Sequence, residues 1–323
     1  MSPEILGIRM WLILLVACAV AAIPFLLAGF LFDIKFLMMF VQWPAISFIP
    51  VRLLRRYPAT YAFAGAIEGI FLMSFAALFG LMICYAAAAG NAPLIDAGLL
   101  RIDRGLGYDW QVYAHFAAAH PWLLQTLRYA YGSNLTQPVV IGAILFMASQ
   151  EPRFEKFILA TIVSMAITVC VFLLLPATTA WTFQGQESLA AKILPDLPTT
   201  TNSWIGDLLH IRSGSGRHLV RPSGIIAFPS FHCASAILNI WAVWRVRMMR
   251  LPFLAFNAVM IAATPLIGGH YIADLIGGAV VAAITIASLD SLHRYLLGLR
   301  WFSLSFPAMW GTRATTRKHL LPY

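Results

Sequence analysis

Charged side chains are scarce in this sequence, and their scarcity excludes a water-soluble protein built round a single core. Only 11% of the 323 residues are charged, whereas 60% are hydrophobic and the mean hydropathy is +0.79. A soluble domain carries about a quarter of its residues as Asp, Glu, Lys and Arg to cover its surface. We therefore expect most of the chain to face lipid instead of water.

Paired cysteines are also missing. The four cysteines lie inside or against apolar runs, with no CxxC pair and no His/Cys spacing that suits zinc: Cys18, Cys84, Cys170 and Cys233. The sequence predicts no disulfide framework, no bound metal and no other cofactor.

Basic residues exceed acidic ones, but their arrangement does not indicate a nucleic-acid partner. The formal net charge is +9, carried in short clusters between apolar runs. Nucleic-acid-binding proteins gather their basic residues on one face or stripe. We expect membrane lipids as partners and no nucleic acid.

Apolar runs of about 20 residues, the length that crosses a bilayer, recur along the chain. The first is too long for a secretory signal peptide and lacks a cleavage site, so we interpret it as an anchor. Two are weaker, because one contains Pro44 and Pro50 and another begins with polar residues. We expect eight crossings, at 10–31, 36–51, 60–88, 133–149, 157–176, 225–244, 252–268 and 272–290.

The predicted fold is all-α, a polytopic membrane bundle. We expect two N-terminal membrane helices at 1–59, a six-helix core at 60–290 and a basic tail at 291–323. The core carries two long loops, 89–132 and 177–224, on the same side of the membrane.

Basic residues are unevenly divided between the two sides of this predicted bundle. The loops on one side hold 13 Lys and Arg residues, and the two long loops on the other side hold 7. Cytoplasmic loops carry the excess of Lys and Arg. We therefore expect a multi-pass protein of the plasma membrane, or of the inner membrane if bacterial. Its C-terminus would be cytoplasmic and its long loops non-cytoplasmic.

Three ionisable residues lie at equivalent depths in the last third of the chain, where burial in a membrane is costly. His270 and Asp274 are four apart, so on a helix beginning after Gly269 they would share one face. The Asp would orient the imidazole, and the helix N-terminus would offer a phosphate site. His232 reaches the same side on a neighbouring helix. Such a His/Asp pair is also common as a purely structural contact.

A cationic segment precedes His232. It runs from Arg212 to Gly224 and includes Arg217, His218 and Arg221. Arginine side chains bind phosphate oxygens through several N–H donors, so this segment could close over an anion. Histidines, a carboxylate and arginines on one side of the membrane together suggest phosphoryl transfer.

Two other features have simpler interpretations. Asp96, Asp103 and Asp109 of loop 89–132 stand among apolar residues at a spacing typical of an amphipathic helix at the membrane interface. A catalytic role for them is left open, since no partner pattern accompanies them. Gly277 and Gly278 indicate close packing of two helices in lipid.

Two of these motifs resemble a known family. Pro229-Ser230-Phe231-His232 is similar to the PSGH element of the type 2 phosphatidic acid phosphatase superfamily, and His270-x3-Asp274 to its SRx5Hx3D element. The Phe-Pro-Ser-x-His and His-Tyr-x-x-Asp forms are closest to the branch containing inositol phosphorylceramide synthases. Two family positions differ, because Gly214 replaces a lysine and Thr264 replaces an arginine.

The resemblance implies a metal-independent lipid phosphatase or phosphotransferase of phospholipid or sphingolipid metabolism. His270 would attack phosphorus to form a phosphohistidine, Asp274 would orient it, and His232 would act as general acid and base. Lipid phosphate would be the substrate, bound by Arg217, Arg221, Ser230 and His218. One alternative is an inositol phosphorylceramide synthase-like transferase that passes a phospho-headgroup to a lipid alcohol. Another is a multi-pass transporter with a His/Asp proton relay.

Overall fold

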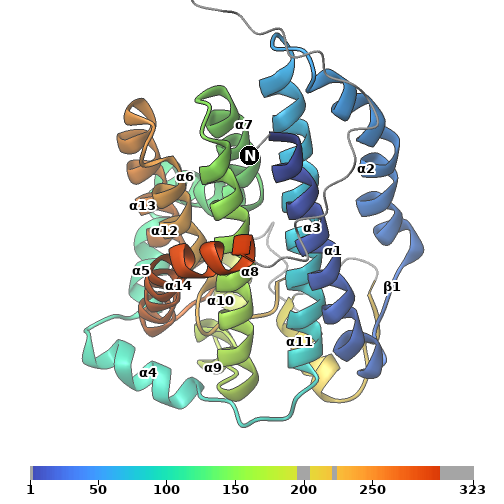
Figure 1. The fold of residues 1–323 in the computed structure, drawn as a ribbon. Coiled ribbons are helices and arrows are strands. Elements are labelled where there is room, and N and C mark those ends of the chain that lie inside the picture. The colour runs from blue at the N-terminus through green and yellow to red at the C-terminus, as the bar shows by residue number, and fades with distance from the viewer. Residues whose placement is uncertain (1–2, 195–203, 220–223, 299–323) are drawn as a thin grey trace, which may run out of the picture.

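Long apolar segments form the longest helices in the computed structural model, which describes residues 3–194, 204–219 and 224–298 (Figure 1). Six helices in this part are long and apolar enough to cross a membrane. They lie within α1 (Pro3–Leu27), α2 (Ile34–Leu54), α3 (Tyr61–Ala88), α8 (Glu151–Leu174), α13 (Arg250–Ile267) and α14 (Ile272–Gly298). The predicted all-α membrane bundle is confirmed.

Two of the eight predicted crossings are shorter than the apolar runs suggested. The runs 133–149 and 225–244 become α7 (Gln137–Met147) and α12 (Phe231–Val243). Both helices start late, because a 3₁₀ turn precedes Gln137 and Ser230 caps α12. The run with Pro44 and Pro50 is instead one continuous helix, α2.

Shorter helices fill the two long connections of the core. The first connection contains α4 (Asp96–Gly105), α5 (Trp110–Ala118) and α6 (Pro121–Gly132), and the second contains α9 (Ala180–Phe183), α10 (Glu187–Ile193) and α11 (Trp204–Arg212). Helix α5 is fastened to the end of α13, since the Trp110 indole donates to the Pro265 carbonyl at 3.1 Å. Helix α4 lies at one end of the bundle and contacts α14 (Figure 1).

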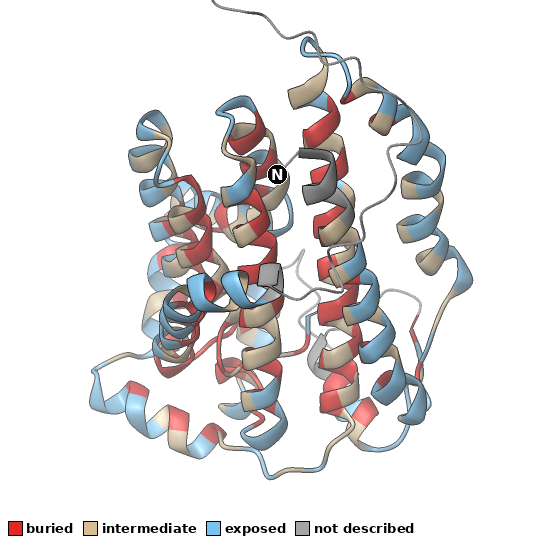
Figure 2. Cartoon of the chain, in the orientation of Figure 1, coloured by how far each residue is buried: buried red, intermediate tan, exposed pale blue. Residues whose placement is uncertain are grey.

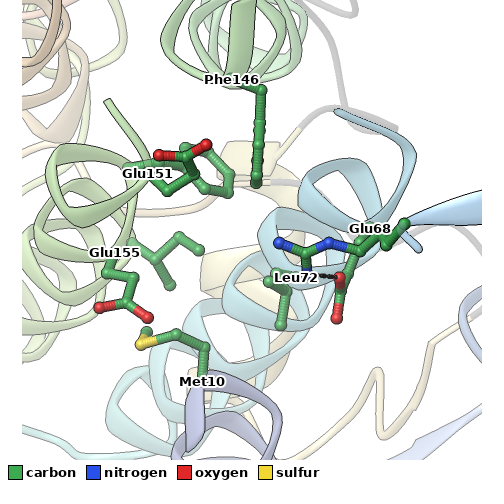
Figure 3. A pocket seen from close by; sticks show the side chains of 9 residues that line it. Met10, Glu68, Leu72, Phe146, Glu151 and Glu155 are labelled. Atoms are coloured by element: carbon green, nitrogen blue, oxygen red, sulfur yellow. Dashed lines mark hydrogen bonds and ion pairs between the residues drawn. The ribbon is translucent and has the colours of Figure 1, made fainter. Parts of the chain in front are cut away.

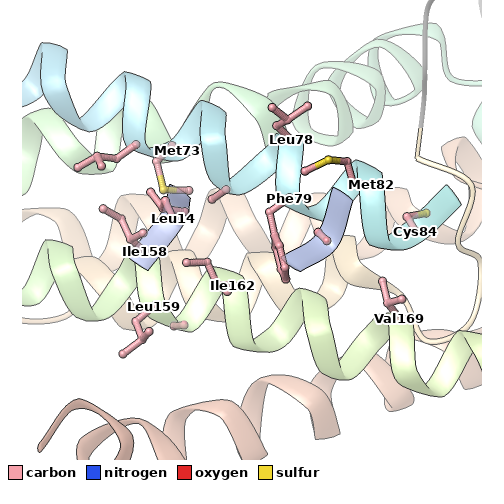
Figure 4. Close-up of a cluster of buried hydrophobic side chains, with 14 of the residues drawn as sticks. Leu14, Met73, Leu78, Phe79, Met82, Cys84, Ile158, Leu159, Ile162 and Val169 are labelled. Atoms are coloured by element: carbon pink, nitrogen blue, oxygen red, sulfur yellow. The ribbon is translucent and has the colours of Figure 1, made fainter. Parts of the chain in front are cut away.

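The main hydrophobic core lies where α1, α3 and α8 pack together. Figure 4 shows Leu14, Phe79 and Ile162 meeting between these three helices. Figure 2 shows exposed positions along α1 and α2. Large apolar residues are among those exposed there, including Val16, Leu27 and Ile49. Exposed apolar surface on this scale suits lipid contact.

The N-terminal helices are tied to the segment before α12 by a short parallel strand pair. Strand β1 (Leu31–Phe32), between α1 and α2, pairs with β2 (His218–Leu219). Asp33 caps α2 by accepting from the Lys35 N–H at 2.8 Å. The pairing of β1 with β2 fixes the position of residues 217–219, because the Leu31 and Asp33 N–H groups donate to the Arg217 and Leu219 carbonyls.

Basic residues gather at the opposite end of the bundle from the histidines. Lys156 contacts Asp290 at 2.5 Å, and Arg153 donates to the Ala242 carbonyl at 3.3 Å. Asp290 is 20 residues along the chain from His270, a rise of about 30 Å on a helix. Three loops counted above on the predicted cytoplasmic side, 52–59, 150–156 and 245–251, thus lie at one end of the molecule and His270 at the other. The basic tail beyond residue 298 lies outside the described residues.

Candidate active site

His270 and Asp274 form a buried pair at the start of α14. His270 Nδ1 lies 3.0 Å from Asp274 Oδ2, and the two residues are 2% and 0% exposed. A carboxylate at Nδ1 favours the tautomer that carries its proton on that nitrogen, and the Ala227 backbone also hydrogen-bonds to the ring. The contact expected from the four-residue spacing is present.

The backbone around His270 differs from the sequence prediction. Helix α14 begins at Ile272, so His270 lies in the segment 268–271 between two helices and not in a first helical turn. Gly269 adopts a φ of +66°, a conformation that glycine accepts without strain, and its carbonyl accepts from the Ala180 N–H at 2.7 Å. The chain therefore turns sharply just before His270.

Burial favours the neutral form of the His270 imidazole. The residue lies outside the membrane-spanning helices, and burial lowers the pKa of its imidazole to about 4. A neutral imidazole can act as a nucleophile through the ring nitrogen that carries no proton.

His232 lies beside this pair on the first turn of α12. The ring centroids of His232 and His270 are 6.2 Å apart, with the planes inclined by 62°. The structure thus brings together the three residues that the sequence singled out, from two helices and the segment between α13 and α14.

Tyr131 is a neighbour that sequence reasoning missed. Its ring stacks on His232 at a centroid distance of 4.1 Å and an interplanar angle of 12°. Both Tyr131 and His270 lie close to Gly268: a Cβ atom added at Gly268 would be 2.6 Å from the Tyr131 hydroxyl oxygen and 2.6 Å from His270 Cδ2. Tyr131 ends α6 of the first long loop, so no local sequence signal connects it to either histidine.

Ser230 joins α12, which carries His232, to α14, which carries Asp274. It is fully buried and caps α12, because its Oγ accepts from the Cys233 N–H at 3.3 Å. Its backbone N–H donates to the Asp274 carbonyl at 2.9 Å. A Cβ at Gly278 would lie 2.3 Å from the Ser230 carbonyl. The expected close packing at Gly278 is therefore present and brings α12 against α14.

The N-terminus of α14 is already occupied by carboxylates from α4. Asp103 accepts from the Ile272 and Ala273 N–H groups at 3.1 and 3.2 Å. Burial raises the pKa of Asp103, and these two N–H groups oppose that rise. The predicted phosphate site at this helix N-terminus is wrong, because the donors that would bind phosphate are already satisfied by protein.

Asp96 extends the same set of contacts. It accepts from the Tyr271 hydroxyl at 3.0 Å and from the Thr178 hydroxyl at 2.7 Å. Asp96, Leu99 and Asp103 are spaced to share one face of α4, and all three are buried. The interfacial-helix interpretation of this loop missed that Asp96 and Asp103 point into the protein, whereas Asp109 is exposed and caps α5.

Of the described residues predicted to bind the anion, Ser230 lies directly before the helix that carries His232, whereas Arg217 and His218 lie at β2. The Arg217 guanidinium lies over the Phe30 ring at 4.6 Å, and His218 is exposed on β2. Arg212 donates to the Ala92 carbonyl. Arg221 lies outside the described residues. Thr264, at the position of the family arginine, is buried and bonds to the Met260 carbonyl at 2.8 Å.

A second group of ionisable residues lies near the basic end of the bundle (Figure 3). Glu68 of α3 pairs with Arg55, and Glu155 of α8 lies 3.8 Å from His293. The cavity beside Glu68 and Glu155 measures about 20 Å³, enough for one water molecule and far too small for a lipid headgroup. Within the described ranges, no group of three or more His, Cys, Asp or Glu residues is arranged to hold a metal ion.

Comparison with known families gives one match. The family model of the PAP2 superfamily matches residues 97–288, more than half of the chain. The matched range begins in α4 and ends in α14, so it contains Asp103, His232, His270 and Asp274. No curated protein and no solved structure matches the chain.

Proposed function

Because this chain belongs to the PAP2 superfamily, whose members are phosphatases and phosphotransferases, we propose that it is an integral-membrane lipid phosphatase or phosphotransferase. The observation that carries the proposal is the buried pair of His270 and Asp274, with the His232 ring centroid 6.2 Å from that of His270. This geometry supplies a nucleophile, a group that orients it and a proton carrier.

In the first proposed step, His270 Nε2 attacks the phosphorus of the lipid phosphate. A P–N bond forms as the P–O bond to the leaving group breaks, and His232, protonated once the negatively charged phosphate lies beside it, gives its proton to the departing oxygen. Asp274 stabilises the positive charge that develops on the His270 ring, because the ring keeps its Nδ1 proton.

In the second step, the acceptor decides between hydrolysis and transfer. His232, now neutral, takes a proton from water or from an alcohol, whose oxygen attacks phosphorus and breaks the P–N bond. Water would release phosphate, and a lipid alcohol would receive the phosphoryl group. These steps need only the protons and lone pairs of the side chains named here, so we propose that the reaction is metal-independent.

The position of the histidines supports a site on the non-cytoplasmic side. They lie at the opposite end of the bundle from Lys156 and Arg153, where the basic loops favour the cytoplasm. A membrane-impermeant maleimide tests this in intact cells, in a chain whose four cysteines are replaced by Ser. We expect labelling of Gly105→Cys, exposed on α4, and none of Met248→Cys until the cells are opened. The reverse pattern would place the site in the cytoplasm.

The finer proposal is transfer of a phospho-headgroup, as in inositol phosphorylceramide synthases. It is supported by the sequence forms Phe-Pro-Ser-x-His and His-Tyr-x-x-Asp, which surround His232 and His270. With a phosphodiester substrate, the group carried on His270 would include the headgroup, and the lipid would leave as an alcohol.

One assay tests the activity and separates these substrates. Purified protein in detergent is incubated with phosphatidate, with a polyprenyl pyrophosphate, or with phosphatidylinositol plus ceramide. We expect turnover of at least one substrate, abolished in His270→Ala and retained in His115→Ala, whose histidine is exposed on α5. Equal turnover by wild type and His270→Ala would refute the proposed function.

A further inference from the structure

Side chains of helix α4 accept hydrogen bonds from the residues that follow His270. The three residues after His270 are each bound by a carboxylate: Tyr271 by Asp274 and Asp96, and Ile272 and Ala273 by Asp103. Two of these three carboxylates come from α4, about 170 residues away in the sequence. Residues 271–273, which connect His270 to α14, are therefore held in place by a helix that is distant in the sequence.

This capping differs from that of the other helices in the site region. Asp109 caps α5 and Ser230 caps α12, each with a side chain directly before its own helix. Residue 271, directly before α14, is a tyrosine whose side chain contacts Asp96 instead. The Ile272 and Ala273 N–H groups are bound by Asp103, so removing Asp103 leaves two donors at the start of α14 without these partners.

Asp103 is placed where it affects the geometry of the His270–Asp274 pair. His270 is separated from Ile272 by one residue, and Asp274 follows Ala273 directly, so Asp103 holds the backbone between the two members of the pair. A shift of this backbone would change the distance between His270 Nδ1 and Asp274 Oδ2. It would also change the direction of Nε2 toward phosphorus.

We propose that Asp103 is a positioning residue for the His270 nucleophile, assisted by Asp96 through the Tyr271 hydroxyl. The inference rests on the proposed function, since it assigns α4 a role in the same reaction. Asp103 touches neither histidine and acts through the backbone of residues 271–273.

Matched variants in the same loop test this inference. Asp103→Ala removes both acceptor oxygens, Asp103→Asn keeps one, and Asp109→Ala removes an N-cap from α5 without touching α14. With the substrate that turns over, we expect Asp103→Ala to lower kcat about 10²-fold with little change in KM, since small misplacements of reacting groups cost about this much. Asp103→Asn should recover part of the loss, and Asp109→Ala should keep wild-type kcat.

A second readout separates positioning from general destabilisation. Nitrogen NMR of labelled histidine reports whether the His270 proton stays on Nδ1, and circular dichroism reports the helix content of each variant. In folded Asp103→Ala we expect His270 to lose its single tautomer, a change that Asp109→Ala does not cause. Unchanged kcat and an unchanged tautomer in folded Asp103→Ala would overturn the inference. A wild type with no turnover would instead overturn the proposed function.

Discussion

Replacing Asp274 by Asn removes a negative charge beside His270 while keeping the size of the side chain. In wild type, Asp274 Oδ2 accepts from His270 Nδ1 and from the Tyr271 N–H at 3.0 and 2.9 Å. The amide oxygen of Asn can occupy the same place and accept from the same two donors. The substitution therefore tests the charge of residue 274 more than its shape.

The expected loss follows from Coulomb's law. In the proposed mechanism, positive charge would develop on the His270 ring when Nε2 bonds to phosphorus, with the carboxylate charge about 4 Å away. At an effective dielectric constant of about 20, this attraction is worth about 4 kcal/mol. Because about 1.4 kcal/mol corresponds to a tenfold change in rate, we expect kcat to fall by up to about 10³-fold.

The assay compares kcat of Asp274→Asn with that of Asp290→Asn in purified, folded protein. Asp290 lies on the same helix with a side chain that is 67% exposed, so its neutralisation should leave kcat near that of wild type. Thermal unfolding should show that Asp274→Asn is at least as stable as wild type, since a buried charge is removed while the acceptor for both hydrogen bonds is kept. The reasoning fails if folded Asp274→Asn keeps more than a tenth of wild-type kcat.

Close backbone approaches and the neutrality of His270 give three more testable consequences. Gly268→Ala should lower kcat about 10²-fold in folded protein, because its Cβ would lie 2.6 Å from the His270 ring, and wild-type kcat would contradict this. Gly278→Ala should lower the unfolding temperature, because its Cβ would lie 2.3 Å from the Ser230 carbonyl and overpacking costs about 1–3 kcal/mol. An unchanged unfolding temperature would contradict that packing. Nitrogen NMR should find His270 neutral from pH 8 down to about pH 5, since a base whose pKa is lowered to about 4 gains its proton only near that pH. Protonation near pH 6.5 would contradict the burial argument.

Hydropathy predicted the fold well because crossing a membrane requires long apolar helices. It failed at the ends of α7 and α12, where capping and turns begin the helix several residues inside the apolar run. Run length alone carries no information about such local hydrogen bonding.

The candidate site was predictable only where its residues are close in sequence. The spacing of His270 and Asp274 was enough to predict their contact. Tyr131 and Asp103 reach the site from more than 100 residues away, and side-chain periodicity cannot indicate such pairs. Arg217 has the chemistry of a phosphate ligand, but the structure places it over an aromatic ring, another favourable partner for a guanidinium.

A covalent phosphohistidine is the central claim of the proposed mechanism, and it can be trapped directly. The lipid substrate that turns over is mixed with the enzyme, the reaction is quenched in base, where phosphohistidine survives, and the peptide containing His270 is examined by mass spectrometry. We expect phosphate, or the phospho-headgroup of a diester, on Nε2 of His270, with more accumulated in His232→Ala. Product formation with no group ever bound to His270, or with the group bound to another residue, would contradict the account.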